Sequence, residues 1–253
     1  MSSQILLENL DFSKLKIHKL QDGQRKTDKF APLSYDGAPL AIVLCKLPNS
    51  VRTPFGAGVP KDKDGNEYKG AQASMQLELT QEQFTKWQEF ESMIVDHFAK
   101  TREACFGHTK HGKRDLSYND YEELFKTALR EGDDSKSYAP TIRVAVETKG
   151  NAAKIQLTKI IGTGMIKPKP GTVDDIGKGA SIVPSIYVKR GVYINDCGFG
   201  VKLALGSCYV DLNNKTEAVE ADEKPPDPDT SGMTMLDDDD AAESPPEKKQ
   251  KRQ

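Results

Sequence analysis

Cationic and aromatic side chains gather in three segments of this 253-residue chain, each of which also contains glycine or proline. Lysine and arginine bind phosphate oxygens, and an aromatic ring offers a flat face on which an unpaired base can stack. That combination is the chemistry of single-stranded nucleic-acid binding, although burial in a core is the alternative for each ring. The candidate residues are Arg52, Phe55, Lys61, Lys63, Tyr68 and Lys69 in the first segment, Lys167 and Lys169 in the second, and Lys189, Arg190, Tyr193, Phe199 and Lys202 in the third.

A further basic run, from His108 to Arg114, lies in a region that also resembles a metal site. Lys110, Lys113 and Arg114 belong to this run, which has no acidic residue. Thiolate and imidazole are natural zinc ligands, but closed zinc sites use paired short spacings separated by a longer loop. We therefore prefer a phosphate-binding loop to a solvated turn or a metal site, and we expect no cofactor. The possible metal ligands are His97, Cys105, His108 and His111.

Catalytic motifs are scarce in the chain. The G-x-G triplets that begin at Gly56, Gly162 and Gly198 do not continue to G-x-G-x-x-G, so a dinucleotide site is not supported. The acidic pairs Asp133-Asp134 and Asp174-Asp175 could hold magnesium if they converged in the fold. We expect no enzymatic activity, and a metal-dependent nuclease remains an alternative.

The charge of the chain is divided between a basic body and an acidic tail. From Glu217 to Arg252 there are five basic and twelve acidic residues, 5 − 12 = −7, so the total of −2 leaves +5 on the rest. A basic body attracts a polyanion, and a carboxylate-rich tail competes for the same surface. The acidic run is Asp237, Asp238, Asp239 and Asp240, which could also recruit replication proteins. A disordered tail that only increases solubility is the alternative.

The last residues of the tail have the form of a nuclear import signal. Lys248, Lys249, Lys251 and Arg252 follow two prolines that favour an extended backbone. We therefore expect an import receptor as a partner and a nuclear location, with a cytoplasmic viral factory or a virion as the other possibilities. No apolar run approaches the roughly twenty residues that a membrane helix needs, so no membrane partner is expected.

Hydrophobic periodicity predicts the elements that would position these residues. Two-residue alternation indicates strands, whereas apolar residues at helical spacing after Thr80 and after Ser117 indicate two helices, the second ending at Gly132. The predicted strands are residues 15–20, 40–45 and 75–79, a hairpin of 142–146 with 155–157, and two or three short strands in 180–212.

These elements predict an α+β domain with a mainly antiparallel sheet, because the connections are too short for repeated parallel crossovers. We expect an OB-like curved sheet or barrel in residues 1–215, with a helical hairpin inserted at about 80–132. Residues 216–253 form the predicted disordered acidic tail.

Four short motifs, in order, resemble the OB-fold single-stranded-DNA-binding proteins of nucleocytoplasmic large DNA viruses. The likeness spans about 11–212 and implies a five-stranded barrel with a helical insertion, sequence-tolerant binding of single-stranded DNA, and no catalysis. The chain departs from it at Ile194, where we would expect a second ring beside Tyr193. The motifs are Asp11-Phe12-Ser13-Lys14-Leu15, Val51-Arg52-Thr53-Pro54-Phe55-Gly56, Tyr138-Ala139-Pro140-Thr141-Ile142-Arg143-Val144, and Asp175-Ile176-Gly177-Lys178-Gly179 leading through Val192-Tyr193 to Gly198-Phe199-Gly200-Val201.

The sequence as a whole predicts a non-catalytic binder of single-stranded DNA that acts in viral-type replication, repair or recombination. A structural or scaffold protein of the virion or nucleus, which ignores nucleic acid, is the main alternative. The choice between DNA and RNA stays open because stacking and phosphate contacts serve both polymers.

Overall fold

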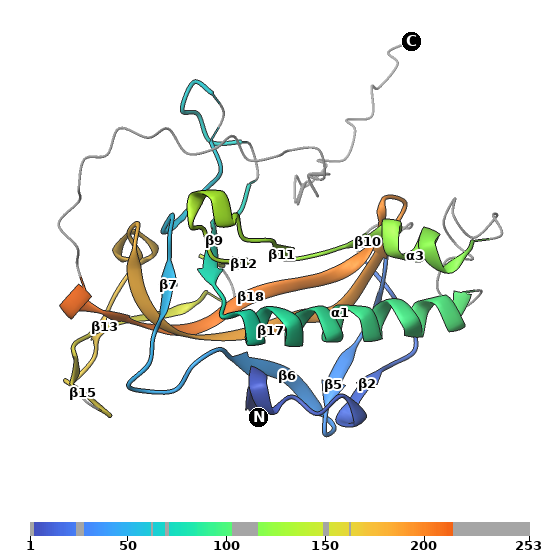
Figure 1. The fold of residues 1–253 in the computed structure, drawn as a ribbon, viewed down its shortest axis with the longest axis horizontal. Coiled ribbons are helices and arrows are strands. Elements are labelled where there is room, and N and C mark those ends of the chain that lie inside the picture. Colours follow the sequence, from blue (N-terminus) through green and yellow to red (C-terminus); the bar gives the residue numbers. More distant parts are fainter. Residues whose placement is uncertain are drawn as a thin grey trace, which may run out of the picture.

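Two long antiparallel strands, β17 (Ala180–Asn195) and β18 (Gly198–Asp211), cross the molecule and organise its sheet (Figure 1). The sequence predicted two or three short strands here. The strands are long because their pairing continues past two register shifts, one after Ser185 and one after Val188. Gly206 of β18 is left out of the pairing at the first shift and Gly191 of β17 at the second, but neither glycine ends the strand. This computed structural model describes residues 3–23, 28–61, 63–68, 71–102, 116–148, 152–161 and 163–214.

The turn between the two strands depends on a glycine. Gly198 has a φ of +135°, and a Cβ atom at this position would lie 2.1 Å from the carbonyl oxygen of Leu124. Only glycine allows so close an approach of two backbones. The tip of the hairpin is thereby packed against the end of helix α3 (Tyr118–Leu124).

Strands from the N-terminal third of the chain pair with β17. The strands that contact it directly, all antiparallel, are β4 (Lys29–Ala31), β6 (Ala38–Val43) and β7 (Val51–Thr53). Those that extend this side of the sheet are β1 (Ser3–Leu6), β2 (Leu15–Ile17), β3 (Gln21–Asp22) and β5 (Leu33–Tyr35). The alternation predicted at residues 15–20 thus yields the short edge strand β2.

Strands from the second half of the chain pair with β18. Those parallel to it are β10 (Phe125–Lys126), β12 (Thr141–Ala145) and β13 (Lys154–Thr158). The strands beyond them are β8 (Ala57–Gly58), β9 (Ser74–Glu78), β11 (Leu129–Arg130) and β16 (Lys169–Pro170), and a separate hairpin consists of β14 (Ile160–Ile161) and β15 (Gly164–Met165). Single 3₁₀ turns are η1 (Leu7–Asn9), η2 (Phe12–Lys14), η4 (Asp134–Lys136), η5 (Val173–Asp175) and η6 (Leu212–Asn214).

The predicted hairpin between residues 142–146 and 155–157 is wrong. β12 and β13 do not pair with each other in the described structure; both run parallel to β18, with Ala145 opposite Ala204 and Lys154 opposite Ser207. The chain leaves this edge of β18 after β12 and returns to the same edge as β13. Alternation in a sequence shows which side chains share a face, but it does not name the partner strand.

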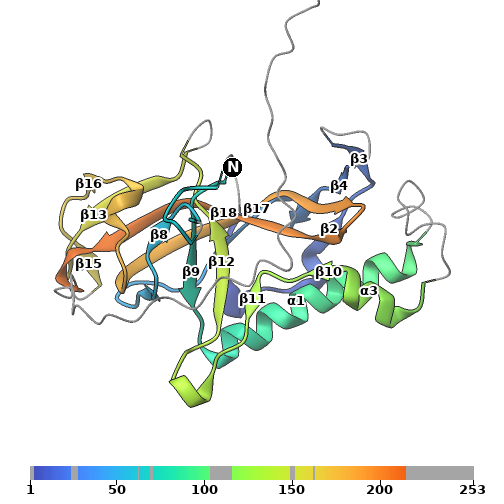
Figure 2. The same ribbon diagram turned by 90° about the horizontal axis from the view of Figure 1, so that it is seen from above.

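The predicted class, α+β with a mainly antiparallel sheet, is confirmed. Pairing among the described strands follows the unclosed order β2-β5-β6-β17-β18-β12-β9-β8, so of the expected OB-like curved sheet or barrel the closed form is not seen and the OB-fold is not confirmed. The parallel pairs are those of β1 with β6 and of β10, β12 and β13 with β18. From above, α1 lies along one side of the sheet, with β13 and β16 at one end of the molecule and α3 at the other (Figure 2).

Helix α1 (Gln81–Lys100) begins at the predicted capping box. The backbone amide of Gln83 donates to the Thr80 hydroxyl, and the Thr80 amide donates to the Gln83 side chain. The side chains of its apolar stripe are all buried, which confirms that the stripe faces the core: Phe84, Trp87, Phe90, Ile94 and Phe98. One hydrophobic core joins this stripe to the sheet.

The second helix begins at Ser117 as predicted but ends at Leu124, well before Gly132. The cause is a buried carboxylate on α1. Glu91 accepts hydrogen bonds from the Thr127 hydroxyl at 2.7 Å and from the Ala128 amide at 3.1 Å, which hold this segment in an extended path. Within the predicted helical hairpin of residues 80–132, the described parts, 80–102 and 116–132, therefore contain one long helix, one short helix and two short strands. No helix in the described ranges is long and apolar enough to cross a membrane.

We expect Glu91→Ala to lower the free energy of unfolding by about 2–4 kcal/mol, because it leaves three donors, including the Trp87 indole, without their acceptor. Burial raises the pKa of Glu91, so its contribution to stability is greatest below pH 4.5 and falls as pH rises through the higher folded-state value. Glu91→Gln should lose this pH dependence. Urea denaturation across pH measures both effects.

Glu89→Ala, on the exposed side of the same helix, is the matched control and should change stability by no more than about 0.5 kcal/mol. Equal losses for the alanine variants at positions 89 and 91 would contradict the role given to Glu91.

Candidate nucleic-acid interface

The sheet has one face that points away from the core, which we call the outer face. Ile182, Ile186, Val192 and Ile194 of β17 are buried, so the side chains that alternate with them lie on the opposite side. Alternation in β18 and β13 extends the same face. The side chains that we call the outer-face stripe are Lys154, Tyr187, Lys189, Tyr193, Lys202 and Tyr209.

A bulge in β17 concentrates cations at the centre of this stripe. Between the pairs Val188–Leu203 and Val192–Val201, the three residues Lys189, Arg190 and Gly191 stand opposite Lys202 alone. Bulges commonly redirect side chains at functional sites. The three cations are therefore Lys189, Arg190 and Lys202. They belong to one segment of the sequence, and the register of β17 with β18 brings them together in space.

The bulge forces an unusual backbone conformation on Arg190. This exposed residue has a φ of +58°, in the left-handed region that non-glycine residues rarely adopt. Next to it, Gly191 has a φ of +95°, and a Cβ there would lie 2.1 Å from the carbonyl oxygen of Ala31. The close approach of β4 thus fixes the bulge and with it the strained position of Arg190.

Tyr193 is half-buried on the outer face. Its ring lies against Gly200, whose added Cβ would be 3.1 Å from the phenol oxygen, and the Lys202 ammonium lies 5.6 Å from the ring centroid. Burial raises the pKa of Tyr193 to about 12, so the phenol is neutral at physiological pH. Phe30 pairs in register with Tyr193, and the exposed Lys126 pairs in register with Gly200.

Tyr187 and Lys189 share a carboxylate that the sequence did not reveal. The Tyr187 hydroxyl donates to Oε2 of Glu147 at 3.0 Å, and the Lys189 ammonium lies 2.5 Å from Oε1. Burial and the contact with Glu147 raise the pKa of Tyr187 to about 12. Lys189 therefore lies on the expected face, but its charge is already compensated.

The expected stacking role of Phe199 is wrong, because its side chain is completely buried. It packs against Phe98 and Phe125 at centroid distances of 5.1 and 5.2 Å, and against Tyr121 at 6.5 Å. The signal was present in the sequence: Phe199 continues the alternation of Val201, Leu203 and Leu205, which places it on the core face.

The first predicted segment divides between two places. Arg52 pairs in register with Ser181, on the outer face of β17; it is exposed and lies 3.4 Å from Glu78. Phe55, in the turn after β7, is 46% exposed, as stacking requires. Lys61, Lys63 and Tyr68 follow β8 in the chain, and β8 pairs with β9 and not with β17. Lys69 is outside the described residues.

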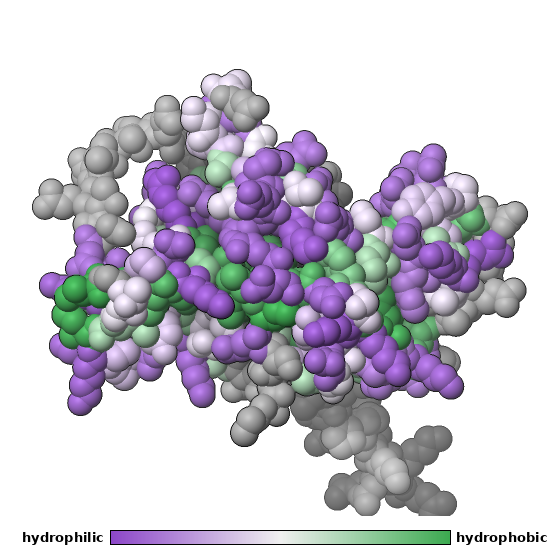
Figure 3. Space-filling view, turned by 60° about the horizontal axis from the view of Figure 1, so that its bottom comes forward, coloured by the Kyte–Doolittle hydropathy of each residue, from purple (hydrophilic) through white to green (hydrophobic). Residues whose placement is uncertain are grey.

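The second predicted segment does not join the stripe. Lys167 and Lys169 are exposed, but Lys169 pairs with Leu157, a residue that packs against the core, so its side chain belongs to the opposite face. These lysines adjoin an exposed apolar hairpin that contains Ile161, Met165 and Ile166. Figure 3 shows hydrophobic side chains at this left end of the molecule, where Figure 1 labels β15.

Several predicted residues lie outside the described ranges, namely Lys110, Lys113, Arg114, Cys105, His108, His111, Asp237, Asp238, Asp239, Asp240, Lys248, Lys249, Lys251 and Arg252. His97 is described: it is half-buried on α1, and burial followed by the charge of Lys100 lowers its pKa. Within the described ranges, no three side chains of His, Cys, Asp or Glu are grouped closely enough to hold a metal ion.

Sequence reasoning missed several residues of this face. Tyr187 and Tyr209 could have been found, because each alternates with buried neighbours in a predicted strand. The others depend on pairing between distant segments, which no local pattern reveals: Phe30, Lys126, Glu147 and Lys154.

No protein-family model and no curated protein matches this chain. Among solved structures, it is similar to the single-stranded DNA-binding protein from bacteriophage Enc34 in complex with ssDNA, with a TM-score of 0.34 and 12% identity over 77% of this chain and 94% of that one. The same phage protein alone matches with a TM-score of 0.34 and 11% identity over 82% and 96% of the chains. Its C-terminal truncation gives 0.33 and 11% over 78% and 94%. At such TM-scores no residue correspondence follows, so the interface is assigned from its own geometry.

We expect Arg190→Gly to raise the free energy of unfolding by about 1 kcal/mol, because glycine adopts a positive φ without steric cost. Arg190→Ala is the matched control: it removes the same charge but keeps the strained backbone, and should not raise stability. Chemical denaturation compares them. A gain shared equally by both variants would mean that charge, not backbone strain, limits stability here.

Proposed function

We propose that this chain is a non-catalytic protein that binds single-stranded DNA across the outer face with little preference for sequence. The observation that carries the proposal is the outer-face stripe, in which the rings of Tyr187, Tyr193 and Tyr209 are interspersed with lysines. Stacking and phosphate contacts of this kind tolerate any sequence. From Tyr187 to Tyr193 the strand spans at most roughly 20 Å, enough for several nucleotides.

The position of the core supports the choice of this face. The buried stripe of α1 packs with the apolar side of the sheet, so that side has no room for a ligand. On the outer face, Lys154, Arg190 and Lys202 are exposed. Arg52 extends the same surface along β7, and the exposed ring of Phe55 lies in the turn that follows.

The biological setting that we propose is DNA replication, repair or recombination of a viral type. The order of the four motifs and the basic cluster from Lys248 to Arg252 support it, the latter through import into a nucleus. In the same proposal, the run from Asp237 to Asp240 recruits replication proteins. A cytoplasmic viral factory or a virion is the alternative location.

A scaffold role is the second candidate, and one observation favours it. Ile161, Met165 and Ile166 are exposed together at the β14–β15 hairpin, where a protein partner could cover them. A scaffold that ignores nucleic acid would show no gel shift with single-stranded DNA at any salt concentration.

Titration with oligothymidine should give affinities that fall steeply with salt, with a log-log slope of about −0.7 for each phosphate contacted. Lys202→Ala and Arg190→Ala should each make that slope shallower by about 0.7, whereas Lys86→Ala, on α1, should leave it unchanged. A flat salt response would remove the proposal. Tighter binding of RNA than of DNA in a competition experiment would mean that RNA is the preferred ligand.

Deletion of residues 216–253 should tighten binding of oligothymidine at low salt, because the acidic tail competes for the cationic surface. Replacing Asp237, Asp238, Asp239 and Asp240 by asparagine should give part of the same effect without shortening the chain. Fluorescence anisotropy at two salt concentrations measures both variants. Unchanged or weaker binding would indicate that the tail only increases solubility.

A further inference from the structure

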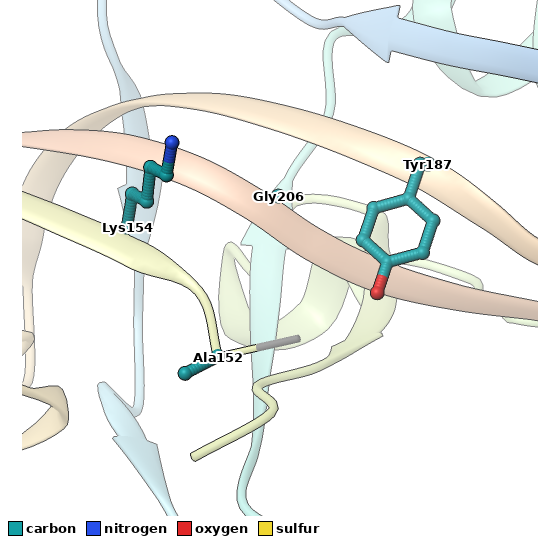
Figure 4. A pocket seen from close by; sticks show the side chains of 4 residues that line it. All are labelled: Ala152, Lys154, Tyr187 and Gly206. Carbon is teal, nitrogen blue, oxygen red and sulfur yellow. The ribbon is translucent and has the colours of Figure 1, made fainter. Parts of the chain in front are cut away.

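A shallow depression of about 340 Å³ opens on the outer face, between β13, β17 and β18. It is lined by Ala152, Lys154, Tyr187 and Gly206. In Figure 4 the side chains of Lys154 and Tyr187 stand on opposite sides of Gly206. The depression thus has a ring on one wall, a cation on the other, and a floor without a side chain.

Gly206 keeps the floor open. It is the extra residue of β18 at the register shift beside Ser185, so it lies outside the regular pairing. A Cβ at this position would be 3.4 Å from Cδ1 of Tyr187, in contact with the edge of the ring. Any larger side chain here would occupy the space beside Tyr187.

Glu147 fixes the orientation of the Tyr187 ring. Glu147 lies two residues beyond the end of β12, and the backbone around it is anchored. The Val146 amide donates to the Ala73 carbonyl at 2.7 Å, and the Ala153 amide donates to the Glu147 carbonyl at 2.9 Å. Its Oε2 accepts the hydrogen bond of the Tyr187 hydroxyl. A ring held in this way loses little conformational entropy when a ligand stacks on it.

The same carboxylate also restrains Lys189. The Glu147 side chain is only 9% exposed, and the Lys189 ammonium lies 2.5 Å from its Oε1. The ion pair of a lysine with a nearly buried carboxylate carries no net charge, so it attracts a phosphate only weakly. Lys154, on the far wall of the depression, is exposed. Of the two lysines, Lys154 is therefore the one positioned to bind phosphate.

We propose that this depression seats one base of the bound strand, with Tyr187 stacking on the base and Lys154 contacting the adjoining phosphate. In this proposal, which rests on the function proposed above, Glu147 is a positioning residue that orients the ring and withholds Lys189 from the strand. The site takes any base, because a ring and an ammonium recognise the flat face and the phosphate common to all nucleotides.

The first test fills the depression. Gly206→Leu should weaken binding of oligothymidine by about tenfold or more, the equivalent of one lost stack, with an unchanged salt slope. It should bind an abasic oligodeoxynucleotide of the same length as tightly as the unsubstituted protein does. Gly58→Leu is the matched control, because Gly58 lies on β8 with open space around it. Equal loss for thymidine and abasic oligonucleotides would overturn the base pocket.

The second test releases Lys189. Glu147→Gln keeps an acceptor for the Tyr187 hydroxyl but removes the negative charge, so oligothymidine should bind more tightly with a salt slope steeper by about 0.7. Adding Lys189→Ala should restore the original slope. Were Glu147 a merely structural residue, the glutamine variant would bind more weakly at an unchanged slope, and its positioning role would be refuted.

The two proposals fail in different ways. If the full chain shows no binding of oligothymidine, the proposed function falls. If the full chain binds with a steep salt dependence but Gly206→Leu binds oligothymidine equally well, the function stands and only the base pocket is refuted.

Discussion

Along the whole pairing of β17 with β18, the same face of the sheet must stay turned toward the core, even though the pairing contains two register shifts. Each shift adds residues to one strand, yet Ile182, Ile186, Val192 and Ile194 all remain on the core face. A slip of one residue would exchange the two faces and expose the core. Because the phase is kept, apolar side chains meet α1 on one side while rings and lysines are presented together on the other.

Two carboxylates, Glu91, which is buried, and Glu147, which is nearly buried, accept hydrogen bonds from aromatic side chains and hold different parts of the molecule in place. Glu91 connects α1 to the segment between β10 and β11. Its hydrogen bonds hold that segment extended, where the sequence predicted that the second helix would continue. Glu147 lies on the outer face, where it holds a ring and a lysine in fixed relation. Buried charges are retained where partners satisfy them, and each of these charges fixes the geometry around it.

How far the candidate site was predictable differs from one ring to the next. Tyr193 lies on the expected face, whereas Phe199, only six positions along the chain, is completely buried under aromatic side chains of the helical region. The alternation of Phe199 with Val201 in the sequence already predicted that Phe199 lies on the core face. Tyr187 was equally readable from its neighbours, but its partner Glu147 was not, because the two residues are 40 positions apart.

Four properties could be predicted without the fold: the capped start of α1, the buried stripe of that helix, the α+β class, and the division of charge between body and tail. These properties arise from backbone geometry and composition within a segment, where neighbours in the chain are neighbours in space. Three other features became visible in the folded structure: β12 and β13 both pair with β18, three cations meet at the bulge, and Lys189 forms an ion pair with Glu147. Such features depend on contacts between segments far apart in the chain, and no local period encodes which distant segment will supply the partner.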